Sequence, residues 1–227
     1  MVKGFKICGI SDLDTLNYIL NHPYPPKFIG FITNYEKSKR FVEFEKLKKL
    51  ISVNRKKINF VSVLVNPDDK TLEKIKDLDF DYYQLYDVSP ERTKIIKKKY
   101  KIKIISALTI QNKDDVNKYK SFMELSEIIL FDGKGYEKSL GFNHDLINDL
   151  PNSLNKMIAG NIKIEDIPKL NYREFFIDLS GSLENNDGKK DIKKINKLLN
   201  SAAKIWNWEK KFQKSIKVIN SVFGVAN

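Results

Sequence analysis

Lys6-Ile7-Cys8-Gly9-Ile10 lies near the start of this 227-residue chain and contains its only cysteine. Apolar residues lead up to Cys8, and Gly9 ends the run, so the stretch predicts a strand whose last residue presents a thiol at the start of a loop. Ser11 and Asp12 then offer an N-cap for a following helix. A lone cysteine is often a packing residue, so whether Cys8 has a chemical role depends on the rest of the chain.

Seven further short apolar runs follow the first one. They cover residues 27–32, 60–65, 81–86, 102–107, 127–132, 155–160 and 174–179. Stretches with helical spacing or helix-start signals separate most of them. Nearly continuous hydrophobicity is typical of a parallel sheet covered on its outer face, and eight such strand–helix units predict an α/β fold, a single (β/α)8 TIM barrel. A doubly wound open sheet is the competing fold, but it usually has fewer strands.

The chain contains no Pro- or Gly-rich linker, so we expect one barrel domain over residues 1–200 and a C-terminal helical extension over 201–227. Trp206 and Trp208 lie in an amphipathic stretch of this extension. We expect the extension to pack on the barrel, and a dimerisation surface anchored by the two tryptophans is the other interpretation. Either a monomer or a homodimer fits this pattern.

The composition narrows the classes of partner. The formal net charge is +12, but the excess is nearly all lysine spread along the chain, which does not favour a nucleic-acid-binding face. No apolar run reaches the roughly 18 residues of a membrane helix, and no cleavable leader is recognisable. One cysteine excludes an internal disulfide and multi-cysteine zinc sites and favours a cytoplasmic protein. His22 and His144 are too far apart to suggest a metal site, and no Gly-rich fingerprint suggests a nucleotide cofactor.

Active sites of such barrels lie at the carboxyl ends of the strands. A thiol on the first strand, Cys8, and a carboxylate on the sixth, Asp132, could face each other there as base and acid. Small and hydroxyl residues after the seventh and eighth strands are typical of a phosphate cradle built from backbone N–H groups. The cradle would consist of Gly160, Asn161, Ser180, Gly181 and Ser182.

Several of these segments resemble the phosphoribosylanthranilate isomerase family in the order expected. The opening motif 6–10, followed by Gly30-Phe31 and by Ser38-Lys39-Arg40-Phe41-Val42, is the most specific part of the resemblance. Residues 63–66, 83–85, 130–132, 159–160, 178–180 and 188–191 match later motifs. The resemblance extends over residues 3–200 and implies a barrel enzyme without a cofactor.

The resemblance implies an Amadori rearrangement of N-(5'-phosphoribosyl)anthranilate to the 1-deoxyribulose phosphate. Asp132 would protonate the ribose ring oxygen as the general acid, and Cys8 would remove the C2' proton as the general base. We expect the helix that begins near Ser11 to lower the pKa of the Cys8 thiol. Arg40 would bind the anthranilate carboxylate, and Gln84 and Asp178 would also contact the substrate.

This chain departs from the family pattern at five places. Gln84-Leu85-Tyr86-Asp87 replaces the common Gln-Leu-His-Gly, Gly160-Asn161 replaces Gly-Gly, and Ser180-Gly181-Ser182 replaces Ser-Ser-Gly. After the sixth strand, Gly133-Lys134-Gly135-Tyr136 partly replaces a Gly-rich loop, and Phe142-Asn143-His144 replaces Phe-Asp-Trp. Asn161 has a Cβ where glycine would allow close approach of phosphate, although asparagine tolerates left-handed conformations well. The departures leave a second hypothesis open, namely a divergent, non-catalytic barrel that binds a phosphorylated ligand or a protein partner.

Overall fold

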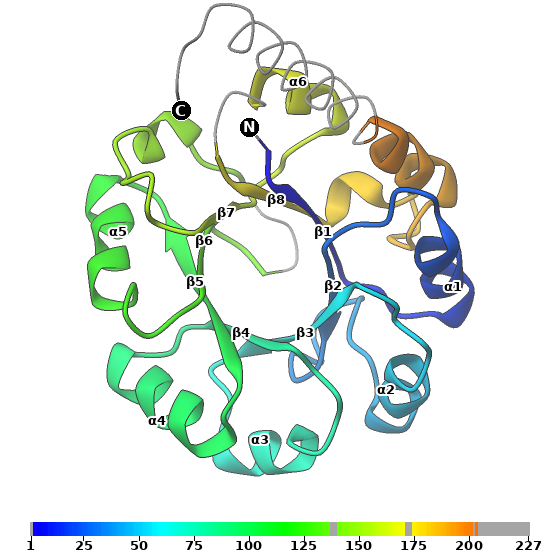
Figure 1. The fold of residues 1–227 in the computed structure, drawn as a ribbon, viewed down its shortest axis with the longest axis horizontal. Helices are drawn as coiled ribbons and strands as arrows, with labels where there is room; N and C mark the ends of the chain where they lie inside the picture. Colours follow the sequence, from blue (N-terminus) through cyan, green and yellow to red (C-terminus); the bar gives the residue numbers. More distant parts are fainter. Residues whose placement is uncertain (1, 137–139, 171–173, 202, 204–227) are drawn as a thin grey trace, which may run out of the picture.

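The computed structural model describes residues 2–136, 140–170, 174–201 and 203. In this part of the chain, parallel strands close into a barrel in sequence order, with β8 paired to β1 (Figure 1). The strands are β1 (Gly4–Cys8), β2 (Phe28–Ile32), β3 (Asn59–Val65), β4 (Tyr82–Tyr86), β5 (Lys103–Ile110), β6 (Ile128–Gly133), β7 (Lys156–Ile158) and β8 (Phe176–Leu179). The predicted (β/α)8 barrel is confirmed.

Helices surround the barrel on the outside (Figure 1). They are α1 (Leu13–Asn21), α2 (Phe44–Ile51), α3 (Asp69–Ile75), α4 (Pro90–Tyr100), α5 (Lys113–Asn117), α6 (Ile167–Leu170) and a last helix over 192–201. Their N-termini follow the capping signals of the sequence: Asp12 accepts a hydrogen bond from the backbone N–H of Thr15 at 2.8 Å, and Pro90 occupies the first turn of α4. None of the described helices is long and apolar enough to cross a membrane.

Two connections differ from the regular alternation. The helix after β5 is short: α5 ends at Asn117 and is followed by the 3-10 turn η1 (Lys118–Ser121). Between β6 and β7 the described residues form only the 3-10 turn η2 (His144–Ile147). The turns η3 (Ile164–Asp166) and η4 (Gly181–Leu183) follow β7 and β8. The predicted C-terminal extension, including Trp206 and Trp208, lies outside the described residues except for Ser201 and Ala203.

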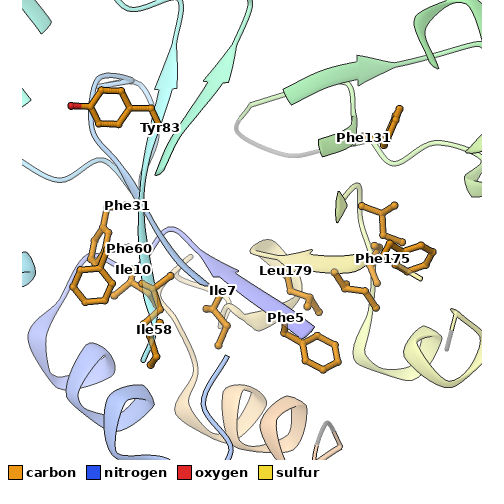
Figure 2. Close-up of a cluster of buried hydrophobic side chains, with 14 of the residues drawn as sticks. Phe5, Ile7, Ile10, Phe31, Ile58, Phe60, Tyr83, Phe131, Phe175 and Leu179 are labelled. Carbon is orange, nitrogen blue, oxygen red and sulfur yellow. The ribbon is translucent and has the colours of Figure 1, made fainter. Parts of the chain in front are cut away.

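The larger part of the core lies between the strands and the helices. Side chains from the outer faces of the strands, such as Phe5, Phe31 and Phe131, are buried there (Figure 2). Phe31 meets Phe60 edge-on, with ring centroids 5.1 Å apart. Truncating one such phenylalanine to alanine costs about 3–5 kcal/mol, so this layer supplies the rigidity on which the strand ends depend.

A second core fills the barrel interior. Its floor is aromatic, with the ring of Phe28 edge-on to Tyr82 at 5.6 Å and to Phe176 at 5.1 Å. Above this floor the interior becomes polar: Lys6, Gln84 and Asp178 are all buried. A buried polar layer is costly unless its members are paired, which points to the end of the barrel above it as the candidate site.

Candidate active site

Cys8 is the last residue of β1 and points into the barrel, where its side chain packs among the interior residues. Alternation along a strand places Lys6 on the same inner face, two residues below. On the neighbouring strand, Gly30 pairs with Cys8 in register. A Cβ on Gly30 would lie 3.0 Å from both the Cys8 Sγ and the Lys6 Nζ. Glycine at this position therefore provides the space for a thiol and an ammonium group side by side.

The buried ammonium group is paired across the barrel seam. Lys6 Nζ donates a hydrogen bond to Asp178 Oδ2 at 2.7 Å, and both side chains are almost fully excluded from solvent. Burial alone would lower the pKa of Lys6, but the Asp178 carboxylate and the Cys8 sulfur together raise it above its usual value. Asp178 was predicted to contact the substrate; in this structure its contact is with Lys6.

The electrostatic environment of Cys8 differs from the sequence-based expectation. Burial raises the pKa of the Cys8 thiol above its usual value, while the charges of Lys6 and Lys190 oppose that rise and Asp178 adds to it. The pKa of Cys8 is therefore raised overall, opposite to the lowering expected from the helix start near Ser11. The physical reason is that desolvation inside the barrel outweighs the nearby positive charges.

Asp132 lies near the end of β6, and a tyrosine from β4 holds it. The Tyr86 hydroxyl donates a hydrogen bond to Asp132 Oδ2 at 2.8 Å. Gln84 Nε2 in turn donates to the Tyr86 hydroxyl oxygen at 3.3 Å. Burial, followed by the negative charges of Asp132, Asp178 and Cys8, raises the pKa of Tyr86 well above its usual value. Gln84, predicted to contact the substrate, is fully buried, and its side chain contacts Tyr86.

Two aromatic side chains from the loops after β6 and β2 continue from this tyrosine. Tyr136, in the loop after β6, meets Tyr86 edge-on with ring centroids 5.5 Å apart, and Tyr35, after β2, meets Tyr136 at the same distance. The Tyr136 hydroxyl donates a hydrogen bond to the Asp87 carboxylate. Asp87 has a φ of 54°, the left-handed conformation that favours glycine. Two of the departures from the family pattern, Tyr86 and Asp87, are thus in contact with one loop residue.

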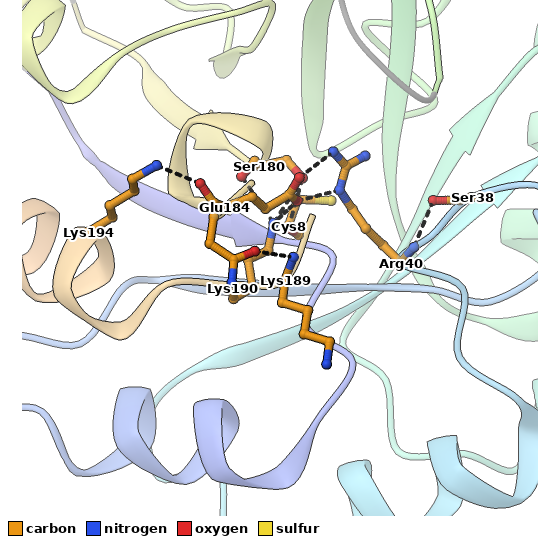
Figure 3. A network of polar contacts seen from close by, with 9 residues as sticks. Cys8, Ser38, Arg40, Ser180, Glu184, Lys189, Lys190 and Lys194 are labelled. Carbon is orange, nitrogen blue, oxygen red and sulfur yellow. Dashed lines mark hydrogen bonds and ion pairs between the residues drawn. The ribbon is translucent and has the colours of Figure 1, made fainter. Parts of the chain in front are cut away.

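Arg40 belongs to a charged network on the other side of Cys8 (Figure 3). Its Nε and Nη2 atoms donate to Glu184 at 2.5 and 2.9 Å, and Lys190 Nζ donates to the same carboxylate at 2.6 Å. Gly9, with a φ of +80°, permits this arrangement, because a Cβ there would lie 2.4 Å from the Arg40 Cδ. Although burial would raise the pKa of Glu184, its partners Arg40 and Lys190 hold it below the usual value.

The residues predicted to form a phosphate cradle lie in the loops after β7 and β8. Asn161 has a φ of 56°, so this asparagine adopts the left-handed conformation in place of the usual glycine. Ser180 Oγ donates a hydrogen bond to the backbone carbonyl oxygen of Cys8 at 3.0 Å, which connects the loop after β8 to the end of β1. Gly181 begins the turn η4, and the buried Ser182 Oγ has no hydrogen-bond partner among the described residues. The structure thus brings Cys8, Arg40 and Ser180 together. Gln84 and Asp132 lie together around Tyr86, to which both are hydrogen-bonded.

Three charged residues near these side chains were not predicted from the sequence. Lys6 belongs to the opening motif, and its position two residues before Cys8 in a strand could have placed both side chains on one inner face. Lys190 and Glu184 gave no such signal, because they lie beyond β8 and reach the site only through the tertiary fold. Burial lowers the pKa of Lys190, against the opposing effect of Glu184. Across the described ranges, no cluster of His, Cys, Asp and Glu could hold a metal ion.

The comparison with known families and proteins agrees with this geometry. A model of the family described as N-(5'-phosphoribosyl)anthranilate (PRA) isomerase matches residues 5–201. The chain is 30% identical over 214 residues to the N-(5'-phosphoribosyl)anthranilate isomerase of Rhizobium rhizogenes, covering 89% of this chain and 95% of the relative. It is 35% identical over 211 residues to the Staphylococcus aureus protein of the same name, covering 86% and 94%.

Solved structures show the same fold. The phosphoribosylanthranilate isomerase of Thermotoga maritima superposes with a TM-score of 0.76 at 24% identity, covering 89% of this chain and 99% of that chain. A second structure of such an isomerase, in complex with reduced 1-(o-carboxyphenylamino)-1-deoxyribulose 5-phosphate, superposes with a TM-score of 0.75 at 24% identity and the same coverage.

Proposed function

Because the chain belongs to the N-(5'-phosphoribosyl)anthranilate isomerase family, we propose that it converts N-(5'-phosphoribosyl)anthranilate to 1-(2-carboxyphenylamino)-1-deoxyribulose 5-phosphate. This is an aldose–ketose isomerisation of tryptophan biosynthesis. One observation supports the assignment of roles: Cys8 is the last residue of β1 and Asp132 lies near the end of β6, so both belong to the same end of the barrel. A base and an acid around one point are what the reaction needs.

The reaction transfers two protons within one substrate. Asp132 gives its proton to the ribose ring oxygen, the C1'–O bond breaks, and a Schiff base forms. The Cys8 thiolate then removes the proton from C2', which gives an enolamine that tautomerises to the ketone. Lys6, beside Cys8 in the interior, stabilises the thiolate form, and Lys190 adds a second positive charge.

Substrate binding would use the charged and small residues around this pair. Arg40 is the donor proposed for the anthranilate carboxylate, because a planar guanidinium can bind a carboxylate with two hydrogen bonds. Its bidentate contact with Glu184 supports this role by fixing the guanidinium plane beside Cys8. The phosphate would occupy the cradle, which consists of Gly160, Asn161, Ser180, Gly181 and Ser182. The unpartnered Ser182 Oγ supports a ligand there.

The partner implied by this function is a small phosphosugar. The biosynthetic role supports a cytoplasmic location, which cell fractionation would test. A monomer and a homodimer both remain compatible with the reaction, because every residue assigned above comes from a single chain. Light scattering of the full chain would decide between them.

Turnover of freshly generated N-(5'-phosphoribosyl)anthranilate tests the proposal through the loss of substrate fluorescence. Cys8→Ser and Asp132→Asn should each lower kcat by at least about 100-fold, the usual contribution of a general acid or base. Asp187→Asn, which removes an exposed carboxylate in the loop after β8, is the matched control and should keep the wild-type rate. A folded wild-type protein without turnover would refute the isomerase and favour the non-catalytic barrel.

A further inference from the structure

Asp132 has a hydrogen-bond donor of its own in the barrel, and that donor is a residue in which this chain departs from the family pattern. We propose that Tyr86 is the positioning residue of the general acid: its hydroxyl fixes the Asp132 carboxyl group and stabilises the negative charge that forms when Asp132 gives up its proton. The inference rests on the proposed function and adds a residue to its machinery. The 2.8 Å bond from the Tyr86 hydroxyl to Asp132 Oδ2 is the contact that carries it.

The direction of this hydrogen bond follows from its surroundings. Gln84 Nε2 donates to the Tyr86 oxygen at 3.3 Å, which leaves the single O–H of Tyr86 to point at Asp132. Both Gln84 and Tyr86 are buried, which limits the access of water to the donor. Burial and the nearby Asp132 raise the pKa of Tyr86 well above its usual value. Tyr86 therefore keeps its proton throughout the reaction and acts as a donor to the acid.

The ring that carries this hydroxyl is held from the barrel mouth. Tyr136 packs edge-on against Tyr86 with ring centroids 5.5 Å apart, and its own hydroxyl bonds to Asp87, the next residue in the chain. Edge-to-face pairs of this kind stabilise one orientation of each ring. A connected unit is thus formed by Tyr86, Asp87 and Tyr136. Tyr86 and Asp87, at the end of β4, depart from the family pattern, and both contact the aromatic residue Tyr136 of the loop after β6.

A hydrogen bond to a carboxylate is stronger than one to a neutral carboxylic acid. When Asp132 protonates the ring oxygen, it changes from a neutral carboxylic acid to a carboxylate. The hydrogen bond from Tyr86 therefore strengthens as the transition state is reached. Interactions of this kind raise kcat and leave ground-state binding nearly unchanged. The expected loss on removing the hydroxyl is about 10- to 100-fold in kcat.

Two substitutions at position 86 separate positioning from packing. Tyr86→Phe keeps the ring and removes the donor, so kcat should fall by about 10- to 100-fold while KM stays within about twofold of wild type. Tyr86→His is the poorer steric match but restores an N–H donor, and it should recover most of the lost kcat. Tyr83→Phe is the control, because Tyr83 is buried on the outer face of the same strand (Figure 2) and should tolerate the change.

The readouts are kcat and KM from the fluorescence assay, the thermal midpoint of each variant, and calorimetric binding of the reduced product analogue. A Tyr86→Phe protein with wild-type kcat would overturn the assignment, and so would a Tyr86→His protein that is no faster than Tyr86→Phe. Wild-type binding of the analogue by a slow, folded Tyr86→Phe protein would support it. A wild-type protein that neither turns over substrate nor binds the analogue would refute the proposed function and this inference with it.

Discussion

Replacing Lys6 with methionine tests how much the buried ion pair between Lys6 and Asp178, below Cys8, contributes to the stability of the fold. Lys6 Nζ lies 2.7 Å from Asp178 Oδ2, and neither side chain is more than 5% exposed. With an effective dielectric constant of about 20, the Coulomb attraction at this distance is about 6 kcal/mol. Much of that attraction offsets the cost of removing two charges from water. The net value of the pair is therefore small, whereas the cost of breaking it is large.

In Lys6→Met the Asp178 carboxylate stays buried without its hydrogen-bond donor, and its Oδ1 already has no partner among the described residues. Breaking such a pair costs about 3–5 kcal/mol, which for a domain of this size lowers the thermal midpoint by about 6–20 °C. Burial raises the pKa of Asp178, and Lys6 opposes that rise. Without Lys6 the pKa of Asp178 rises further, so the carboxyl group protonates more readily and the destabilisation should shrink as the pH falls from 7 to 5.

Urea unfolding followed by circular dichroism at both pH values measures the effect. The double variant Lys6→Met/Asp178→Leu should recover most of the stability, since it replaces the pair with apolar side chains. Comparison of the single and double variants gives the coupling energy directly. A Lys6→Met protein within 1 kcal/mol of wild type, or a double variant no more stable than Lys6→Met, would contradict the conclusion that the pair is buried and ionised.

Two further predictions concern catalysis. Burial raises the pKa of Cys8, so the thiolate fraction grows with pH over the working range. Below the pKa of the thiol, kcat/KM should rise by about tenfold per pH unit. A profile that is flat from pH 6 to 9 would mean that Cys8 is not the titrating base. Arg40→Lys loses the planar fork that meets Glu184 and should raise KM for the natural substrate about tenfold or more. A substrate analogue with aniline in place of anthranilate lacks the carboxylate, so its KM should change little. An equal rise in KM for both substrates would show that Arg40 does not bind the carboxylate.

The fold was largely predictable from local patterns. Each apolar run has the length of one strand, and most are followed by capping residues such as Asp12 or by helical spacing, so local patterns alone predict most of the alternation of strands and helices. The repeated unit then leaves few ways to pack, and a closed parallel barrel covers both faces of every strand. The short helix after β5 is less predictable, because helical propensity alone is a weak guide to where a helix ends.

The positions of Cys8 and Asp132 were also accessible from sequence, because a residue that ends a barrel strand lies at the mouth by geometry. Their partners were not. Lys6 and Asp178 are 172 positions apart, Arg40 and Glu184 are 144 apart, and Tyr86 and Asp132 are 46 apart, so closure of the barrel alone brings these pairs together.

Local sequence patterns therefore predict the barrel, the order of its strands and the places of the two proposed reacting groups, Cys8 and Asp132. The tertiary structure decided which charges surround those groups and how strongly solvent is excluded. The Cys8 pKa shows the difference: a nearby helix start predicted a lowered value, whereas burial inside the barrel raises it. Desolvation depends on everything that encloses a group, and that enclosure exists only once the chain has closed on itself.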